Sequence, residues 1–359
     1  MDKLQDKIQG SLIGGAIGDA LGYPVEFISY NEILARYGAR GIKRLEASEY
    51  ASGKAVVSDD TQMTLFTANG LLLTDQQTMT PLQGIKQAYL EWYETQTGQR
   101  EGEASCWVRD VPELNHNRAP GTTCMSALSS LKHGVKPKND SKGCGGVMRV
   151  APIALYAAVG NRMDILHADK LAGDAAALTH LHPIGFISAA LLSHIVYRIM
   201  QAGHVGRSDM EDSIRDGVEA MRKIYSEYQS DVQRMGELAN LAISLSANAQ
   251  TDIANVRRLG EGWVGEEALA ISLYCALKYI DNFEEAMIAA VNHSGDSDST
   301  GAITGNILGA ILGYEALPQC YKDTLEMHDL ILHMADDVYR GAVSDFPVGE
   351  YFPSRESVE

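Results

Sequence analysis

The sequence predicts an all-α protein that folds as one domain over residues 1–359. Apolar residues recur at helical spacing along most of the chain, whereas alternation with a period of two is scarce and is suggestive only at residues 41–45. The sequence shows no low-complexity linker and no internal repeat. Acidic motifs lie toward both ends of the chain, and they can share one site only if the chain folds as a single domain.

The bulk composition allows a large core and argues against some partners. The chain has 359 residues, of which 45% are hydrophobic, and this is enough for one large domain or two ordinary ones. Its formal net charge of −17 argues against binding nucleic acid or an anionic membrane through a basic surface. We therefore expect neither nucleic acid nor membrane among its partners.

The cysteines and the apolar segments indicate a cytoplasmic protein. The five cysteines are odd in number, far apart and without a CxxC pair, as expected for reduced thiols. Asp19 interrupts the apolar residues 11–22 and no A-x-A site follows, so no signal peptide is expected. Residues 175–197 lack Asp, Glu, Lys and Arg, but Pro183 and two histidines break the run, which favours a buried helix over a membrane span.

The first predicted helix begins near Leu4 and carries a row of glycines. These glycines, at spacing four, are Gly14, Gly18 and Gly22. Glycine at every turn lets another backbone approach closely, despite its cost to helix stability. The row is not a dinucleotide-binding fingerprint, because the order is wrong and no strand precedes it. Pro24 is expected to end the helix, which leaves Glu26 just past its end as a candidate active-site carboxylate.

Helices are predicted along most of the remaining chain. Their approximate ranges are 61–73, 81–97, 122–132, 150–159, 163–178, 184–202, 208–226, 231–246, 264–280, 282–291, 300–312 and 322–339. We expect residues 29–54 to be irregular. Residues 98–121 are rich in Gly, Asn, Glu and Pro, and we expect them to form a long loop at the wall of a site.

An acidic turn with the sequence S-D-D-T lies at residues 58–61, directly before an apolar helix. The simplest interpretation is a helix cap, because hydroxyl and carboxylate groups favour the first turn of a helix. Adjacent aspartates also repel one another, so gathering several of them would raise their pKa values unless cations neutralise them.

A second acidic turn, H-S-G-D-S-D-S-T-G, occupies residues 293–301 and leads into a run of small apolar residues. Ser299 and Thr300 are good N-cap types. However, two aspartates with interleaved hydroxyls and flanking glycines also supply the oxygen ligands that Mg²⁺, Mn²⁺ or Ca²⁺ select. It is not an EF-hand, because no glutamate closes a twelve-residue loop.

If the two acidic turns meet, they provide enough oxygen for a site that holds two metal ions. The candidate ligands are Ser58, Asp59, Asp60, Asp296, Asp298 and Ser299. A helical prenyl-diphosphate enzyme would also hold Mg²⁺ with aspartates, but its signature is D-D-x-x-D. Residues 59–63 read D-D-T-Q-M and fail that pattern.

Three further features are candidates for binding a substrate. Residues 143–146, G-C-G-G, can expose backbone N–H groups to a phosphate or a sugar, although the Lys-Ser/Thr of a P-loop is missing. His180 and His182 interrupt the helical pattern, and each is a candidate for either a structural or a catalytic role. Trp263 is the aromatic residue that we would place near adenine, with core packing as the alternative.

Together these motifs make the chain similar to the ADP-ribosylglycohydrolase family, which includes dinitrogenase reductase-activating glycohydrolase. The resemblance covers nearly the whole chain. It rests on the glycine row at 14–22 with Glu26, S-D-D-T at 58–61, the loop at 143–149 with Ala151-Pro152, Thr179-His180, and G-D-S-D-S at 295–299. It implies a compact, single-domain orthogonal helical bundle with a cleft that holds two divalent cations, Mg²⁺ or Mn²⁺.

The resemblance also implies roles for individual residues. The six candidate ligands named above would hold the metal ions, and Glu26 would lie near the distal ribose. The residues that would contact the ADP-ribose are Gly143, Cys144, Gly145, Gly146, His180 and Trp263. Cys144 departs from the family, which often has asparagine there, and both hydroxyl ligands are serines where relatives often have threonine. Serine keeps the oxygen but lacks the methyl group that restrains the rotamer.

The function that the resemblance implies is metal-dependent removal of ADP-ribose from ADP-ribosylated protein. We expect an arginine linkage, with serine and O-acetyl linkages as alternatives. Breaking the bond at the anomeric carbon builds positive charge on the ribose, and a carboxylate that collects a proton is typically worth ~10²–10⁴-fold. The candidate catalytic carboxylates are Glu26, Asp60, Asp296 and Asp298, and the sequence does not choose between them.

An alternative from a different class is a binding protein that blocks a cognate ADP-ribosylating toxin by occupying its active site. Only a short segment precedes the glycine-rich helix in this sequence, so no long extension is available to act as a plug. This disfavours pure blocking, and the hydrolase remains the leading hypothesis.

Overall fold

The computed structural model describes residues 2–74 and 79–347, and over these residues the protein is helical. Within the described residues, β-pairing is limited to isolated bridges, at Ser48–Lys54, Ala55–Leu325 and Gly143–Val264. The all-α prediction is therefore confirmed, and residues 41–45 do not form the strand that their alternation suggested. The boundaries of the predicted domain, residues 1–359, extend into segments outside the described residues, so that prediction stays a prediction.

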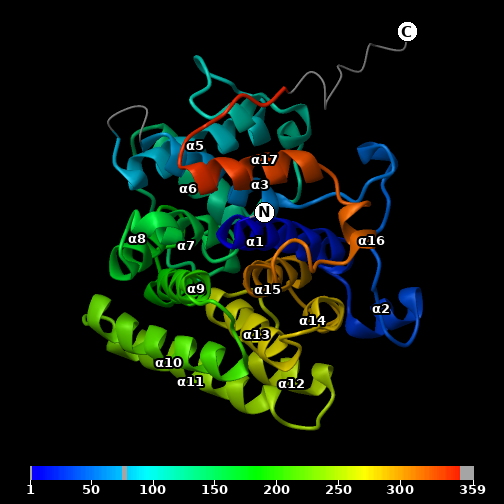
Figure 1. The fold of residues 1–359 in the computed structure, drawn as a ribbon. Helices are drawn as coiled ribbons and strands as arrows, with labels where there is room; N and C mark the ends of the chain where they lie inside the picture. Colours follow the sequence, from blue (N-terminus) through cyan, green and yellow to red (C-terminus); the bar gives the residue numbers. More distant parts are fainter. Residues whose placement is uncertain (1, 75–78, 348–359) are drawn as a thin grey trace.

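Two helices from opposite ends of the chain, α1 (Lys3–Gly22) and α15 (Ser297–Leu312), pack side by side at the centre of the molecule (Figure 1). Glycines line the contact on both helices, in the pairs Gly10/Gly309, Gly14/Gly305 and Gly18/Gly301. A Cβ atom added at Gly18 would lie 2.0 Å from the carbonyl oxygen of Gly301. The glycine row predicted on α1 thus has a matching row on α15, and the two backbones are in direct contact.

The other helices surround this pair (Figure 1). On one side lie α3 (Asp59–Leu72), α5 (Pro81–Thr97), α6 (Thr122–Lys132) and α17 (His328–Arg340). Beside and below the pair are α7 (Ala151–Ala158), α8 (Ile165–Ala177), α9 (Pro183–Gln201), α13 (Gly265–Lys278) and α14 (Phe283–Val291). The periphery holds α2 (Tyr30–Tyr37), α10 (Arg207–Ile224), α11 (Gln229–Ser246), α12 (Asp252–Leu259) and α16 (Gln319–Lys322).

Helix α2 lies in the segment that we expected to be irregular. Ser29 and Glu32 form a complete capping box at its start, and Ile33 is its one buried residue among those described. The helix therefore depends on its cap more than on an apolar stripe, and apolar periodicity could not detect it. Helix α12 is a second short helix that the sequence analysis missed.

The helix predicted at 322–339 is interrupted. The chain between α16 and α17 pairs instead with Ala55, whose N–H donates to the carbonyl oxygen of Thr324 at 2.8 Å, while Glu326 N–H donates to Ala55 O at 3.0 Å. Met327 then adopts a left-handed conformation with φ of 53° before α17 begins. Long-range backbone pairing replaces the local helical hydrogen bonds here, which a local pattern does not reveal.

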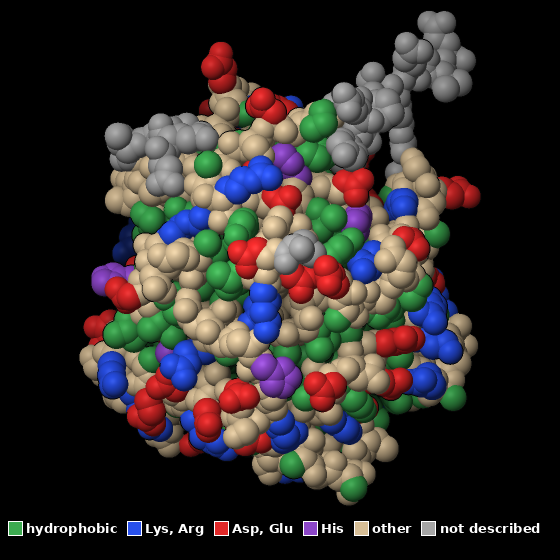
Figure 2. Space-filling model, in the orientation of Figure 1, with side chains coloured by type: hydrophobic (Ala, Val, Ile, Leu, Met, Phe, Trp, Pro, Cys, Tyr) green, Lys and Arg blue, Asp and Glu red, His purple; other side chains and the backbone are tan. Residues whose placement is uncertain are grey.

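Helix α9 agrees with the expectation of a buried apolar helix. Of the helices in the described part of the chain, it alone is long and apolar enough to cross a membrane, and 83% of that apolar window is buried inside the structure. On the face drawn in Figure 2, acidic and basic side chains are interspersed.

Candidate functional site

Each acidic turn forms the N-terminus of a buried helix. At α3, the hydroxyl of Ser58 is the N-cap and accepts a hydrogen bond from Asp60 N at 3.2 Å. At α15 the N-cap is Asp296, whose Oδ1 accepts from Ser299 N at 3.2 Å. The prediction that Ser299 or Thr300 caps this helix is therefore wrong, because the carboxylate of Asp296 starts the helix earlier in the chain.

Asp19 joins the first turn to helix α1. Its buried carboxylate accepts from Ser58 N at 2.9 and 3.1 Å and from Thr61 N at 3.0 Å, so it satisfies N–H groups at the start of α3. The glycine rows meanwhile hold α15 against α1. In the sequence, Asp19 stands out only as an interruption of an apolar patch. The sequence feature that could have indicated its role is a lone carboxylate in a glycine-rich buried helix.

The two acidic turns meet beside Glu26. Among the described residues, carboxyl oxygens of Glu26, Asp296 and Asp298 all lie within 4.8 Å of one another. The side chain of Ser58 hydrogen-bonds Asp298 and so links the first turn to the second. Within the described part of the chain, Glu26 Oε2 and Asp60 Oδ2 are buried without a hydrogen-bond partner. The structure thus brings together the residues that the sequence placed at one site.

The electrostatics of this acidic cluster favour a bound cation. Burial is the main cause that raises the pKa of its carboxyl groups, and the charge of Asp298 is the next cause for the neighbours that surround it. Burial and Asp298 raise the pKa of Asp59 and Asp60 well above the usual range, that of Glu26 to about 10 and that of Asp19 to about 7. Neutralising these groups requires either protons or positive charge.

The donor set fits hard divalent cations. It consists of carboxylate and hydroxyl oxygens on two tight turns, which suits Mg²⁺ or Mn²⁺. One of them, Asp60 Oδ2, is buried without a hydrogen-bond partner among the described residues. The ligands that would hold such ions are those predicted from the sequence: Ser58, Asp59, Asp60, Asp296, Asp298 and Ser299. Glu26 lies close enough to the second turn to contribute as well.

The cluster predicts how stability depends on pH and on cations. Unfolded aspartates titrate at about pH 4, but the folded groups hold their protons to higher pH, so the folded state binds more protons and loses stability as pH rises. We expect the melting temperature in chelator to fall between about pH 5 and about pH 8. Saturating Mn²⁺, which binds the ionised cluster, should raise it more at the higher pH.

Differential scanning fluorimetry with matched ionic strength would measure both effects. Chelator-treated protein without added Mn²⁺ is the control at each pH. A cation-induced shift that is equal at both pH values, or larger at the lower one, would contradict the expected proton linkage.

The Gly-rich loop closes over the site beside Trp263. Residues Cys144–Gly146 form a 3₁₀ turn, and Cys144 N donates to Trp263 O at 3.2 Å. His180 lies beneath this loop and is only 2% exposed, and a Cβ added at Gly145 would come within 3.0 Å of its ring. Burial lowers the pKa of His180 to about 3, so it is neutral. Its proposed contact with substrate stays a prediction, and its observed contacts support the loop.

Trp263 pairs with an aromatic residue that the sequence analysis missed. Phe27, directly after Glu26, stacks on Trp263 with ring centroids 5.5 Å apart and planes inclined by 20°. Phe27 is 74% exposed and Trp263 is 37% exposed. An exposed aromatic pair next to buried carboxylates is a surface on which a planar ring can stack. Its position next to Glu26, a candidate catalytic residue, is the sequence feature that could have indicated that Phe27 belongs to the site.

The loop at 98–121 contributes to the wall of the site, as expected. Asp59 N donates to the carbonyl oxygen of Arg118 at 3.0 Å, and Asp59 Oδ2 accepts from Gly121 N at 3.2 Å. Arg118 is held in turn by Glu326, with 3.4 Å between Nη2 and Oε2. Segments from three distant parts of the chain therefore position one metal-ligand candidate.

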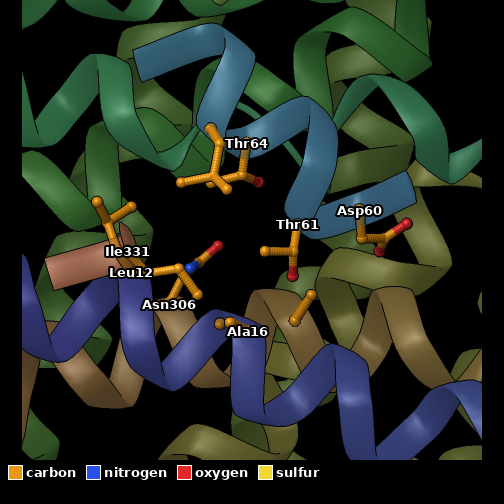
Figure 3. Close-up of a pocket in the computed structure, with 10 residues that line it drawn as sticks. Leu12, Ala16, Asp60, Thr61, Thr64, Asn306 and Ile331 are labelled. Atoms are coloured by element: carbon orange, nitrogen blue, oxygen red, sulfur yellow. The ribbon is translucent and has the colours of Figure 1, made fainter. Parts of the chain in front are cut away.

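A small cavity of about 10 Å³ lies on the interior side of the cluster, between α1, α3 and α15 (Figure 3). The side chain of Asn306 points into it, opposite Thr61 and Thr64. Its volume is that of a single water probe. The interior behind Asp60 is thus closely packed.

The fold and the site define an all-α protein with a buried acidic centre suited to divalent cations. The family model described as ADP-ribosylglycohydrolase matches residues 1–346, so the chain belongs to that family of ADP-ribosyl hydrolases. The resemblance noted in the sequence is confirmed. Members of this family use divalent metals, which agrees with the donor set described above.

The individual proteins that the chain resembles are distant relatives. The chain is 26% identical to ADP-ribosylhydrolase ARH3 of Bos taurus over 221 residues, which are 56% of this chain and 58% of that protein. It is 37% identical to ADP-ribosylarginine hydrolase Tri1 of Serratia proteamaculans over 59 residues, 16% of each chain. The solved structure of an ADP-ribosylglycohydrolase-related protein complex has a TM-score of 0.65 and 21% identity and covers 96% of this chain and 100% of its own, which shows the fold.

Proposed function

We propose that this protein is a divalent-cation-dependent hydrolase that removes ADP-ribose from ADP-ribosylated protein, with arginine as the favoured linkage. The observation that carries the proposal is the convergence of Glu26, Asp296 and Asp298, whose carboxyl oxygens lie within 4.8 Å of one another. The exposed pair of Phe27 and Trp263 next to this cluster would receive the planar adenine. Membership of the family supports the class of reaction.

The chemistry requires a group that stabilises charge and a group that moves a proton. When bound, divalent cations hold the ribose hydroxyls and lower the pKa of a water molecule. We assign the proton transfer to Glu26, because its Oε2 has no partner within the described residues and its side chain is partly exposed. Asp60 Oδ2 also lacks a partner among those residues, but Asp60 is only 3% exposed and so is less accessible to a substrate.

The arginine linkage is favoured on chemical grounds. A guanidine leaving group needs a proton less urgently than an alkoxide does, so one carboxylate acting on water suffices. The name of the Serratia relative refers to ADP-ribosylarginine, although the aligned segment is short. Serine-linked and O-acetyl-linked ADP-ribose are the alternatives.

A panel of linkages tests the proposal. Purified protein is incubated with arginine-linked, serine-linked and O-acetyl-linked ADP-ribose, with Mg²⁺ or Mn²⁺ and with EDTA, and free ADP-ribose is measured by chromatography. We expect the fastest release from the arginine linkage, at least about tenfold faster than from the others, and loss of release in EDTA. Release that is insensitive to EDTA would refute the mechanism, and faster release from another linkage would refute the arginine preference.

The proposed location is the cytoplasm, which the thiols support. All five cysteines are free in the structure, as expected for a reducing compartment. The proposed partner is an ADP-ribosylated protein. A cognate toxin is not part of the proposal, because no feature of the described surface favours one.

A further inference from the structure

The segment between α12 and α13 joins three parts of the candidate site. The carbonyl oxygen of Glu261 accepts from Asp296 N at 2.9 Å, and the carbonyl oxygen of Trp263 accepts from Cys144 N at 3.2 Å. The ring of Trp263 also belongs to the exposed aromatic pair. Residues 260–264, which we call the bridging loop, therefore contact the second acidic turn and the Gly-rich loop and carry one ring of the aromatic pair.

The backbone of the bridging loop bends at two glycines. Gly260 has a φ of 136° and Gly262 has a φ of 86°, conformations that other residues rarely adopt. A Cβ atom added at Gly262 would lie 3.0 Å from the side chain of Thr300 and 3.4 Å from the Cβ atom of Asp296. The loop thus lies directly against the turn that carries Asp296, so a change in the path of the loop would shift the backbone at Asp296.

One carboxylate holds this bend. Glu267 is the third residue of α13, and its Oε2 accepts from Glu261 N at 3.0 Å and from Gly262 N at 3.3 Å. Hydrogen bonds to a carboxylate are stronger than those between neutral groups. A Cβ atom added at Gly260 would lie 2.3 Å from the same oxygen, so this glycine leaves the room that the carboxylate occupies. Both hydrogen bonds go to the backbone of the bridging loop, so Glu267 acts on the site through the loop.

We infer that Glu267 is a positioning residue that sets the affinity of the site for ADP-ribose and for divalent cations. It fixes the bridging loop, and through the loop it fixes the backbone N–H of Asp296 and the ring of Trp263. The inference rests on the proposed function for the identity of one ligand, ADP-ribose. For the cations it rests only on the place of Asp296 in the acidic cluster.

Three variants separate positioning from general stability. Glu267→Ala removes the acceptor, whereas Glu267→Gln keeps a side-chain oxygen that can accept the same two hydrogen bonds. Asp209→Ala is the matched control, because Asp209 is also the third residue of a helix, α10, and its Oδ2 accepts from Gly206 N at 2.8 Å. This control loses a comparable hydrogen bond at the periphery of the molecule (Figure 1).

Calorimetry with Mn²⁺ alone, and with ADP-ribose at saturating Mn²⁺, measures the two affinities. In Glu267→Ala we expect both to weaken by at least about tenfold, because residues that orient a ligand-binding group from behind typically contribute about 10–100-fold. Glu267→Gln should stay within about threefold of the wild type, since its oxygen is still an acceptor. Asp209→Ala should match the wild type in both affinities. Thermal unfolding checks that each protein is folded, and Glu267→Met, which keeps the length of the side chain, replaces Glu267→Ala if that variant does not fold.

The outcomes separate this inference from the proposed function. Wild-type affinities in Glu267→Ala would overturn the role of Glu267. Equal weakening in Glu267→Ala and Glu267→Gln, or weakening in Asp209→Ala, would also overturn it, because the effect would then not come from hydrogen bonds to the bridging loop. A Mn²⁺ affinity that follows the Glu267 variants as expected, in a protein that neither binds nor releases ADP-ribose, would support the role of Glu267 and contradict the proposed function.

Discussion

Replacing Asp298 with asparagine is expected to abolish ADP-ribose release and, at the same time, to stabilise the cation-free protein. Asparagine keeps an oxygen that can accept from Ser299 N and from the side chain of Ser58, so the turn should keep its shape. It removes the negative charge that metal ions require. It also removes the charge that, after burial, most strongly raises the pKa of the neighbouring carboxyl groups of Asp59, Asp60, Asp296 and Glu26.

The expected magnitudes are large for activity and modest for stability. Release of ADP-ribose should fall by at least about 10³-fold, because the variant loses the metal ions that would activate water. In chelator near pH 8, Asp298→Asn should gain about 1 kcal/mol in free energy of unfolding, because a shift of one pKa unit corresponds to about that energy. The gain that Mn²⁺ gives to wild type should disappear. Urea unfolding with and without Mn²⁺ measures both quantities.

Asp169→Asn is the matched control. Asp169 is also a buried carboxylate whose pKa is raised by burial, to about 6, but its Oδ2 pairs with His194 Nδ1 at 2.8 Å on the α8–α9 contact. Its replacement should lower stability and leave Mn²⁺ binding intact. If Asp298→Asn kept the Mn²⁺-dependent gain in stability, Asp298 could not be a ligand, and the position of the metal centre would have to be revised.

Much of the fold was predictable because most helices bury an apolar face or carry clear end signals. Helix α5 has Pro81 at its start, a Thr80–Gln83 capping box and Gly98 after it, and its predicted range agrees with the observed one. The interrupted helix before α17 was not predictable in the same way. Its break depends on pairing with Ala55, nearly 270 positions away in the chain, and no local pattern contains that information.

The sequence indicated which residues belong to the candidate site. It did not indicate which other residues they contact. Two acidic turns with interleaved hydroxyls are unusual enough to be noticed in the sequence. The role of Asp19 was not, because a carboxylate that caps another helix looks like an ordinary charge until the packing of α1 on α3 is known. Phe27 was missed for a similar reason, since its stacking on Trp263 is a property of two loops that meet only in the folded protein.

The glycine rows on α1 and α15 show which features of a helix contact can be predicted from sequence. Spacing four on α1 indicated a close helix contact, and Gly301, Gly305 and Gly309 repeat that spacing near the other end of the chain. The sequence therefore contained both halves of the contact. It did not contain the register, which places Gly18 against Gly301 and so sets the distance between Asp19 and the second acidic turn.

Gly18→Ala is accordingly expected to be strongly destabilising, although alanine is the better helix former. An added Cβ would lie 2.0 Å from the carbonyl oxygen and 2.3 Å from the carbonyl carbon of Gly301. Both are backbone atoms of a buried helix, so they cannot turn aside, and α1 must move away from α15. We expect the free energy of unfolding to fall by about 3 kcal/mol, because overpacking outweighs the ~1 kcal/mol that alanine gains in helix propensity.

Gly203→Ala provides the control, since a Cβ there would meet no atom within 4 Å, and its stability should change by less than about 0.5 kcal/mol. Urea unfolding in chelator measures both variants. Gly18→Ala should also weaken Mn²⁺ binding, because α1 carries Asp19 and α15 carries Asp296 and Asp298, and ligand geometry tolerates only about 0.5 Å of displacement. A Gly18→Ala protein as stable as wild type would mean that the two backbones are not in contact. The glycines would then not be what brings the two acidic turns together.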